Sequence, residues 1–449
     1  MRRVEEWSLI YEYIRSLARI VYRASNKHIT VNGIENVPKN EPVIFAPNHQ
    51  NALDDPLAIL LTSSVFQPVF LARADIFKNK FISRILNTFK ISPIYRIRDG
   101  KESLDKNKEV FENSVRILSN NKMMCLFPEA RHIGMKSMLP HKKAIPRIVF
   151  IAANQTNFEL NVNIVPVGIN YSHYYNYRRS IVVNYGKPIK SSQYYSIYKE
   201  SGETKASSAL RDDLYEALKE LVIHVPDKEV YDVYELGFEL ATKKACKKLK
   251  LKNSLKHFYE CEKFITQKLE NQFKQHPQDS AHWQQKAVEY KTLKRRLKFH
   301  ESELEKGKAT FADVFKVGIP ALMLLIFGFF GALAHGWLFY LTRYPYRKLI
   351  KDKQFYSSFS VVLSLVAYPL WIIGLFFILN SLLNSFLLAL ILLVFSVPSG
   401  IIAWEAGQMF MKLRNRFRIG ALLKKNNKSI LRLFELRKEL NLFFDEVLS

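Results

Sequence analysis

Cysteine is scarce in this sequence. Among 449 residues there are three, Cys125, Cys246 and Cys261, and they lie far apart. A disulfide framework uses an even number of cysteines, and a cysteine-based zinc site uses closely spaced pairs. The sequence therefore excludes both. We expect the three thiols to be packing residues in a reducing compartment.

Acidic residues are few relative to basic ones. Lysine and arginine number 67 and aspartate and glutamate 41, which gives a formal net charge of +26. This excess favours an acidic partner, such as anionic lipid, a phosphorylated substrate, an acidic carrier protein or nucleic acid. The basic residues are scattered over helical segments without the interleaved aromatic residues of a binding sheet, so we expect no nucleic acid as partner.

Charge is absent from two long runs near the C-terminus. Residues 317–341 contain no Asp, Glu, Lys or Arg, and neither do residues 354–404. A membrane-spanning helix needs about 20 apolar residues, so the second run accommodates two spans and a turn. We place these two spans at residues 359–379 and 386–404.

Basic stretches follow both runs, at residues 343–353 and 412–428. The positive-inside rule puts both stretches on the cytoplasmic side. If the N-terminal domain is cytoplasmic too, the first run must return to the side from which it entered. Pro320, His335 and three glycines interrupt this run. We therefore prefer a re-entrant or interfacial hairpin over 317–341 to a simple span.

The rest of the chain reads as an α/β domain followed by a helical arm. Short apolar strands alternate with amphipathic helices between residues 28 and 190, which indicates a mixed sheet flanked by helices. We expect an N-terminal amphipathic, membrane-associating helix at 1–27, for which packing on its own domain is an equal alternative. The α/β domain covers 28–225, a charged helical arm 226–312, membrane segments 313–411 and a basic amphipathic tail 412–449.

The segment from Asn48 to Pro56 carries the most informative polar residues. It directly follows an apolar strand at 42–46, and α/β proteins expose reactive side chains where strands end. A helical turn beginning near His49 brings His49 and Asp54 onto neighbouring faces. A carboxylate beside a histidine ring fixes its tautomer and stabilises its protonated form, so this pair can deprotonate a hydroxyl.

Two further segments complete a pattern. Leu126-Phe-Pro-Glu-Ala-Arg-His132 and Ile164-Val-Pro-Val-Gly168 each follow or form an apolar strand. Together with His49 and Asp54, this order resembles the glycerophospholipid acyltransferase superfamily, with its His-x4-Asp, Phe-Pro-Glu-Gly and Val-Pro-Val blocks. The segment 43–54 resembles in particular the glycerol-3-phosphate and dihydroxyacetone-phosphate acyltransferase branch. The resemblance covers residues 28–190, and extends more loosely to 315–380.

The resemblance implies a role for each matching residue. His49 becomes the general base and Asp54 the residue that orients it, while Glu129 belongs to the acceptor-binding site and Asn51 replaces a small polar residue there. An arginine that contacts the acceptor phosphate corresponds to Arg96 or Arg98, since a guanidinium binds phosphate oxygens in a bidentate way.

The sequence departs from the family at two glycines. Ala130 follows Glu129 where the family has glycine, and alanine resists the positive φ that glycine tolerates, so we expect a reshaped loop. The family's next arginine is replaced by His132. The phosphate contact then passes to Arg131, or to Lys142 and Lys143, which precede the second replaced glycine, Ala144.

The sequence thus predicts a membrane-bound O-acyltransferase. It moves an acyl group from acyl-carrier protein or coenzyme A to glycerol 3-phosphate or 1-acylglycerol 3-phosphate, in the cytoplasmic membrane with the catalytic domain facing the cytoplasm. We expect no cofactor besides the acyl donor and no metal. The alternative is a non-catalytic lipid-binding or scaffold protein on the same fold, which has no need of a base and its orienting carboxylate.

Overall fold

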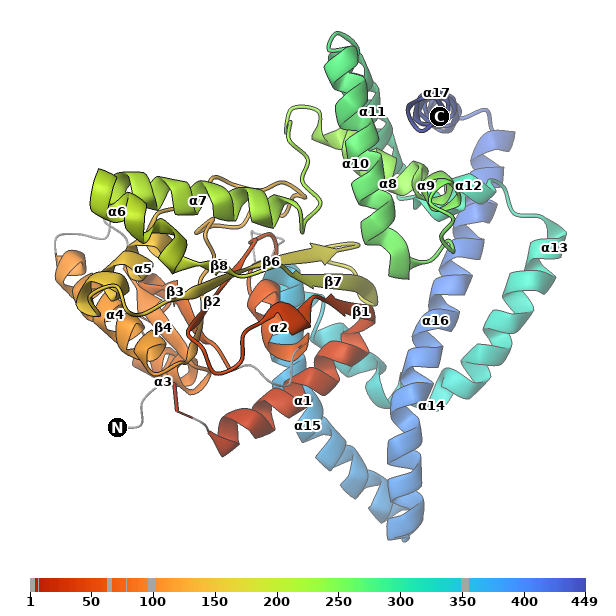
Figure 1. Cartoon of the computed structure of the whole chain (residues 1–449). Helices are drawn as coiled ribbons and strands as arrows, with labels where there is room; N and C mark the ends of the chain where they lie inside the picture. The colour runs from red at the N-terminus through yellow and green to blue at the C-terminus, as the bar shows by residue number, and fades with distance from the viewer. Residues whose placement is uncertain (1–4, 7, 63–66, 78, 96–101, 349–354) are drawn as a thin grey trace. The chain divides into compact units, whose positions relative to one another are not determined.

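The computed structural model describes the chain except residues 1–4, 7, 63–66, 78, 96–101 and 349–354 (Figure 1). It consists of two compact units. The first contains Met1–Pro226 and Ser254–Tyr259, and the second contains Asp227–Asn253 and Glu260–Ser449.

The first unit is built on an eight-stranded mixed sheet. The strands follow the order β1-β7-β6-β2-β5-β3-β4, and β8 pairs with β6. The pairs β6–β7 and β6–β8 are antiparallel, and the other pairs are parallel. The strands are β1 Asn26–Asn32, β2 Val43–Pro47, β3 Val69–Arg73, β4 Ile91–Ile94, β5 Met123–Cys125, β6 Asn163–Tyr171, β7 Arg179–Tyr185 and β8 Ile189–Lys190.

Helices flank this sheet, as the alternating pattern predicts. The main core joins β2, β3, β5 and β6 to α4, α5, α6 and α7, through fully buried side chains such as Ile44, Leu118, Val149 and Ile164. The helices of this unit are α1 Leu9–Ser25, α2 Asp54–Thr62, α3 Lys80–Thr88, α4 Glu102–Ser119, α5 Ala144–Gln155, α6 Tyr195–Ser201 and α7 Glu203–Lys219, with short 3-10 turns between them.

Helix α1 packs on its own domain through one face. Tyr11, Arg15, Ala18 and Tyr22 are buried, and Arg15 Nε donates to the carbonyl of Leu60 at 3.2 Å. A second face exposes four large apolar side chains to solvent, and these are Leu9, Ile10, Tyr13 and Ile20. The packing alternative is therefore observed, and membrane association through the second face stays a prediction.

All the secondary-structure elements that the structure describes in the second unit are helices. Helix α10 ends at Gln275 and α11 begins at Asp279, so Pro277 lies in the turn between them. The tail helix α17 buries Leu433, Leu436 and Leu440 at helical spacing. The helices are α8 Tyr231–Leu240, α9 Thr242–Lys248, α10 Phe258–Gln275, α11 Asp279–Leu297, α12 Glu301–Lys306, α13 Phe311–Asp313, α14 Ile319–Leu341, α15 Phe355–Leu383, α16 Phe386–Lys424 and α17 Lys428–Val447.

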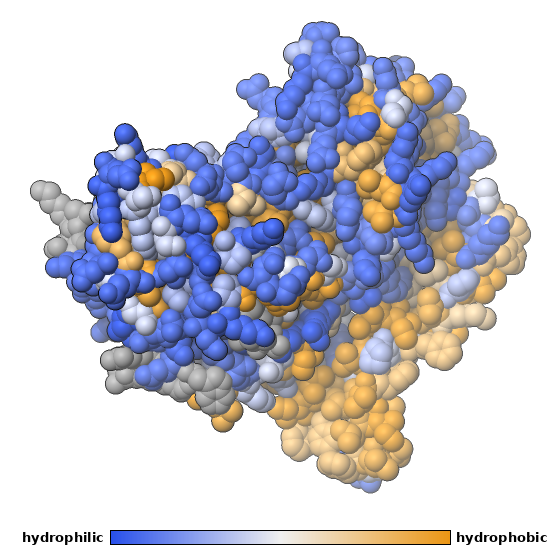
Figure 2. All heavy atoms as spheres, in the orientation of Figure 1, coloured by the Kyte–Doolittle hydropathy of each residue, from blue (hydrophilic) through white to orange (hydrophobic). Residues whose placement is uncertain are grey.

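Three helices of this unit are long and apolar enough to cross a membrane. They cover Phe311–Leu341, Phe359–Leu383 and Phe386–Lys424. Most of their large apolar side chains are exposed, and Figure 2 shows apolar surface gathered around the lower end where α15 meets α16. The two spans expected within 354–404 are found as α15 and α16, which extend beyond the predicted bounds.

Helix α14 is not broken by its glycines. It is one uninterrupted helix from Ile319 to Leu341. Gly328 and Gly331 instead allow α16 to approach, because a Cβ at Gly331 would lie 2.0 Å from the nitrogen of Gly400. The expectation that these glycines interrupt the helix is therefore wrong, since small residues in a membrane helix serve close packing as often as bending.

Candidate active site

Three neighbouring strands bring the candidate residues to one edge of the sheet. Strand β2 lies between β5 and β6 and is parallel to both. The carboxyl ends of all three therefore meet, as in other parallel sheets where sites form at strand ends. His49 follows β2, Glu129 follows β5, and Tyr171 is the last residue of β6.

The histidine contacts an aspartate, and the aspartate is Asp55. His49 Nδ1 lies 2.8 Å from Asp55 Oδ2. The backbone N–H groups of Gln50 and Asn51 donate to the same oxygen, each at 2.8 Å. These bonds fix the carboxylate against the ring. Because Nδ1 is engaged, Nε2 is the nitrogen that can take a proton, and the His49 side chain is 16% exposed.

Asp54 does not contact His49, which corrects the pairing that the motif predicts. Its Oδ2 accepts a hydrogen bond from Arg179 Nη2 at 2.7 Å, and both side chains are buried. The prediction assumed a helical turn beginning near His49. Helix α2 begins only at Asp54, and Ala52 adopts a φ of +40°, so the intervening residues form a non-helical turn that points Asp55 at the ring.

The turn is also anchored by two asparagines. Asn48 continues the pairing of β2 with β6, since its side chain exchanges two hydrogen bonds with the backbone of Ile169, at 2.7 and 3.0 Å. Asn51 is fully buried and donates to Asp54 and to the carbonyl of Tyr174. Asn51 therefore holds the turn through its Nδ2, and its contact with substrate stays a prediction.

Glu129 lies beside the histidine turn, as the motif predicts. Its Oε1 is 3.4 Å from the backbone nitrogen of His49, and the residue is buried. The His49 ring stacks on Phe127 with a centroid distance of 4.3 Å and meets the edge of His132 at 5.1 Å. Of the predicted binding residues, Glu129 and His132 thus adjoin His49 directly.

Ala130 keeps the left-handed backbone that the family's glycine would allow. Its φ is +57°, and its N–H donates to the carbonyl of Phe127 at 3.2 Å, which closes the turn. The expected reshaping of the loop is therefore not observed. Alanine in this region is less stable than glycine by about 1 kcal/mol, so the turn is held by its surroundings.

The predicted phosphate contacts fall into two groups. Arg131, Lys142 and Lys143 are exposed, and the N–H of Lys142 donates to the carbonyl of Pro128 at 2.7 Å, which places this segment against the Glu129 turn. Arg96 and Arg98 lie outside the described residues. The predicted cations that the structure describes thus lie on the loop between β5 and α5.

Two site residues were not predicted from the sequence. The Tyr171 hydroxyl donates to Asp55 Oδ1 at 2.8 Å, and burial next to the aspartates raises the pKa of Tyr171, which keeps its proton in place. The guanidinium of Arg179 lies 4.7 Å from the centre of the Tyr171 ring. Both residues lie on strands far along the chain, so only the sheet order reveals their contact with the turn after β2.

Known proteins resemble the part of the chain that carries this site. Residues 28–170 match the family model described as Acyltransferase. An uncharacterized acyltransferase of Schizosaccharomyces pombe is 26% identical over 127 residues, which is 28% of this chain and 19% of that protein. Glycerol-3-phosphate O-acyltransferases 1 and 2 of Saccharomyces cerevisiae are 28% and 29% identical, over 28% and 31% of this chain and 16% and 18% of theirs.

Each alignment thus spans less than a fifth of the relative. The stretch that the family model matches contains the His49 turn, the Glu129 turn and most of β6. The family match, the order of the blocks along the chain and their meeting at one sheet edge agree with one another. Residues 28–170 therefore resemble the acyltransferase family in sequence.

Proposed function

We propose that this protein is a membrane-bound O-acyltransferase. It transfers a fatty acyl group from an acyl thioester to a hydroxyl of glycerol 3-phosphate or 1-acylglycerol 3-phosphate. The observation that carries the proposal is the contact between His49 Nδ1 and a buried carboxylate, at the edge of the sheet where the family motifs meet. A lipid-binding scaffold has no use for a base oriented in this way.

In the proposed reaction His49 is the general base and Asp55 orients it. His49 Nε2 takes the proton of the acceptor hydroxyl while the hydroxyl oxygen attacks the thioester carbonyl carbon. The tetrahedral intermediate collapses, the carbon–sulfur bond breaks, and the thiolate receives the proton from the imidazolium. Asp55 stabilises the imidazolium during the step, which is the role of a carboxylate behind a histidine base.

The substrates are proposed from chemistry and from relatives. Two relatives are named glycerol-3-phosphate O-acyltransferases. A net charge of +26 suits a phosphorylated acceptor and an acidic donor, either acyl-carrier protein or coenzyme A thioester. Glu129 next to the His49 turn is proposed to bind the acceptor hydroxyls, and Arg131, His132, Lys142 and Lys143 surround it with donors for the phosphate.

The membrane location rests on the three apolar helices of the second unit. We propose the cytoplasmic membrane, with the domain of residues 28–225 on the cytoplasmic side, because the basic stretches 343–353 and 412–428 follow the apolar runs. Anionic headgroups on that face attract a basic protein and raise the local concentration of a lipid acceptor.

The test uses purified full-length protein in lipid nanodiscs with a radiolabelled acyl donor. Each acceptor is offered separately, with acyl-carrier protein and coenzyme A thioesters in parallel. We expect His49→Ala to lower the rate by about 10² to 10⁴-fold, while His276→Ala, an exposed histidine of the second unit, leaves it unchanged. A wild-type protein that transfers acyl groups to neither acceptor contradicts the proposal and favours the scaffold alternative.

A further inference from the structure

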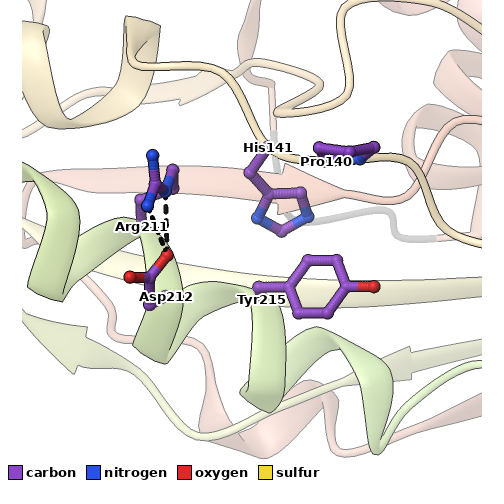
Figure 3. Close-up of a pocket in the computed structure, with 5 residues that line it drawn as sticks. All are labelled: Pro140, His141, Arg211, Asp212 and Tyr215. Carbon is purple, nitrogen blue, oxygen red and sulfur yellow. Dashed lines mark hydrogen bonds and ion pairs between the residues drawn. The ribbon is translucent and has the colours of Figure 1, made fainter.

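A pocket of about 350 Å³ opens beside the candidate active site, between the loop that precedes α5 and helix α7 (Figure 3). It is lined by Pro140, His141, Arg211, Asp212 and Tyr215. The ring of Tyr215 meets the His141 ring edge-on at 5.1 Å, and the two rings form one side of the pocket. The chemistry described above uses none of these five residues.

His141 is the polar group that needs a partner. The residue is 7% exposed, and neither ring nitrogen has a hydrogen-bond partner by distance and angle. The nearby backbone of Arg211 acts to raise the pKa of the ring, but the effect of burial is larger. Burial lowers the pKa of His141 to about 4, so the ring is neutral at pH 7 and offers one donor and one acceptor. A buried polar atom without a partner costs about 1–3 kcal/mol, which a ligand would recover.

Arg211 supplies the charge. Its Nε and Nη2 donate to the same oxygen of Asp212, both at 2.8 Å. A guanidinium carries five N–H groups, so three remain after these two bonds. The Asp212 side chain is 64% exposed, which leaves it screened by water and weakens its hold on the cation. Arg211 is therefore able to bind a further anionic oxygen.

The pocket adjoins the turn that carries Glu129. The backbone N–H of Lys142, the residue after His141, donates a hydrogen bond to the carbonyl of Pro128. Burial, the charge of Glu216 and the charge of Glu129, in that order, raise the pKa of Tyr215. Lys142 and Lys143 add two exposed cations to the same loop. A ligand in this pocket would thus lie against the back of the candidate active site.

We propose that this pocket binds the phosphate-ester end of one of the two substrates, with a phosphate oxygen on Arg211 and a hydroxyl or N–H of the same ligand on His141. The proposal rests on the proposed function for its choice of ligands. Glycerol phosphates and the phosphorylated adenosine of coenzyme A share this chemistry, because each places hydroxyl or N–H groups near a phosphate. The apolar rings of Tyr215 and Pro140 would cover the carbon atoms between the two polar ends.

The test measures protection of His141 from diethylpyrocarbonate, which modifies neutral imidazole, in the full-length His49→Ala protein so that no turnover occurs. Peptide mass spectrometry follows His141 and, as an exposed reference, His276. Glycerol 3-phosphate, coenzyme A, glycerol and inorganic phosphate are added separately. At about ten times its Kd, the true ligand should slow modification of His141 about tenfold and leave His276 unchanged.

The outcome also identifies the source of the phosphate. Protection by glycerol 3-phosphate assigns the pocket to the acceptor, and protection by coenzyme A assigns it to the donor. Arg211→Gln should abolish protection, whereas Lys219→Gln, an exposed cation on the same helix, should preserve it. The proposal is overturned if His141 is not modified, if neither phosphate ester protects it, or if protection survives in Arg211→Gln. Because binding is measured without catalysis, this result is independent of whether acyl transfer is found.

Discussion

The hydroxyl of Tyr171 donates to Asp55 Oδ1 at 2.8 Å, while the other oxygen of the same carboxylate contacts His49 Nδ1 at 2.8 Å. A tyrosine at the end of β6 thus holds the carboxylate that orients the candidate base. The carboxylate accepts two further bonds from backbone N–H groups, so its position is fixed from four directions. This arrangement distinguishes the two adjacent aspartates, since Asp55 contacts the histidine and Asp54 contacts Arg179.

Asp55→Asn should lower kcat far more than it lowers stability. The amide oxygen can still accept the backbone bonds, but a neutral group neither fixes the required tautomer nor stabilises the imidazolium, and losses of about 10² to 10⁴-fold are expected. Asp54→Asn should lower stability far more than it lowers kcat. It leaves the buried cation of Arg179 without its anion, which destabilises a protein by about 3–5 kcal/mol.

The measurement is kcat of each purified variant together with its thermal unfolding midpoint. Equal losses of kcat in both variants at unchanged stability would contradict the assignment of separate roles. Asp54→Asn combined with Arg179→Met removes both charges and should recover part of the lost stability, since no buried charge is then left without its partner.

Tyr171→Phe should lower kcat about tenfold with little change in KM. It removes one hydrogen bond to a charged carboxylate, worth about 1.5–3 kcal/mol, and keeps the ring that packs against Arg179. Tyr174→Phe is the matched control, because its hydroxyl donates to Gln50 Oε1 at 2.7 Å rather than to Asp55. Steady-state kinetics of the two variants test this prediction. An equal loss of kcat in both would mean that the hydroxyl of Tyr171 acts only through folding.

Ala130→Gly should stabilise the protein while Ala144→Gly destabilises it. Ala130 has a φ of +57°, so glycine relieves strain of about 1 kcal/mol. Ala144 is the first residue of α5, where glycine is less stable than alanine by about 0.5–1 kcal/mol. The unfolding midpoint should rise in the first variant and fall in the second. A lower midpoint for Ala130→Gly would show that this turn is not left-handed in solution.

The sequence predicted the sheet and the place of the site because both depend on local signals. Short apolar runs between residues 28 and 190 indicated the sheet, and the motifs marked the ends of β2 and β5. The partner of His49 was assigned wrongly, because the choice between Asp54 and Asp55 depends on where α2 begins. Tyr171 and Arg179 were missed, because their contact with the turn depends on β6 and β7 following β2 in the sheet.

Gly331→Leu should separate α14 from α16. A side chain at this position would overlap the backbone of Gly400, and the N–H of Gly331 also donates to Ser399 Oγ at 2.9 Å. Overpacking of this kind costs about 1–3 kcal/mol or more. Gly336→Leu is the matched control, since a Cβ there meets no atom within 4 Å. Chemical crosslinking with a short bifunctional maleimide between cysteines placed at His335 and Ser396, whose side chains meet at 2.9 Å, reports the pairing. Equal crosslinking in both variants would mean that α14 does not pack on α16 through Gly331.

The part of the chain that contains the three apolar helices should cross the membrane twice in total. Arg416 near the end of α16 forms two hydrogen bonds of 2.8 Å with Asp313, which precedes α14, so the chain enters and leaves on the same side. An even number of crossings follows. Helices α15 and α16 are joined by a tight turn at Asn384 and account for two crossings. Since α14 is a single helix, we expect it to enter the membrane without crossing it, and the chain to return to the side of Asp313 before α15 begins.

Cysteine labelling tests this topology in intact and opened vesicles. Lys348→Cys and Lys425→Cys should react from the same side of the membrane, and Asn384→Cys from the other. The natural cysteines do not interfere, because all three are buried. Since α14 lies between Asp313 and residue 348, labelling of residues 348 and 425 from opposite sides would require α14 to cross. The contact between Arg416 and Asp313 would then have to be absent from the membrane-bound protein.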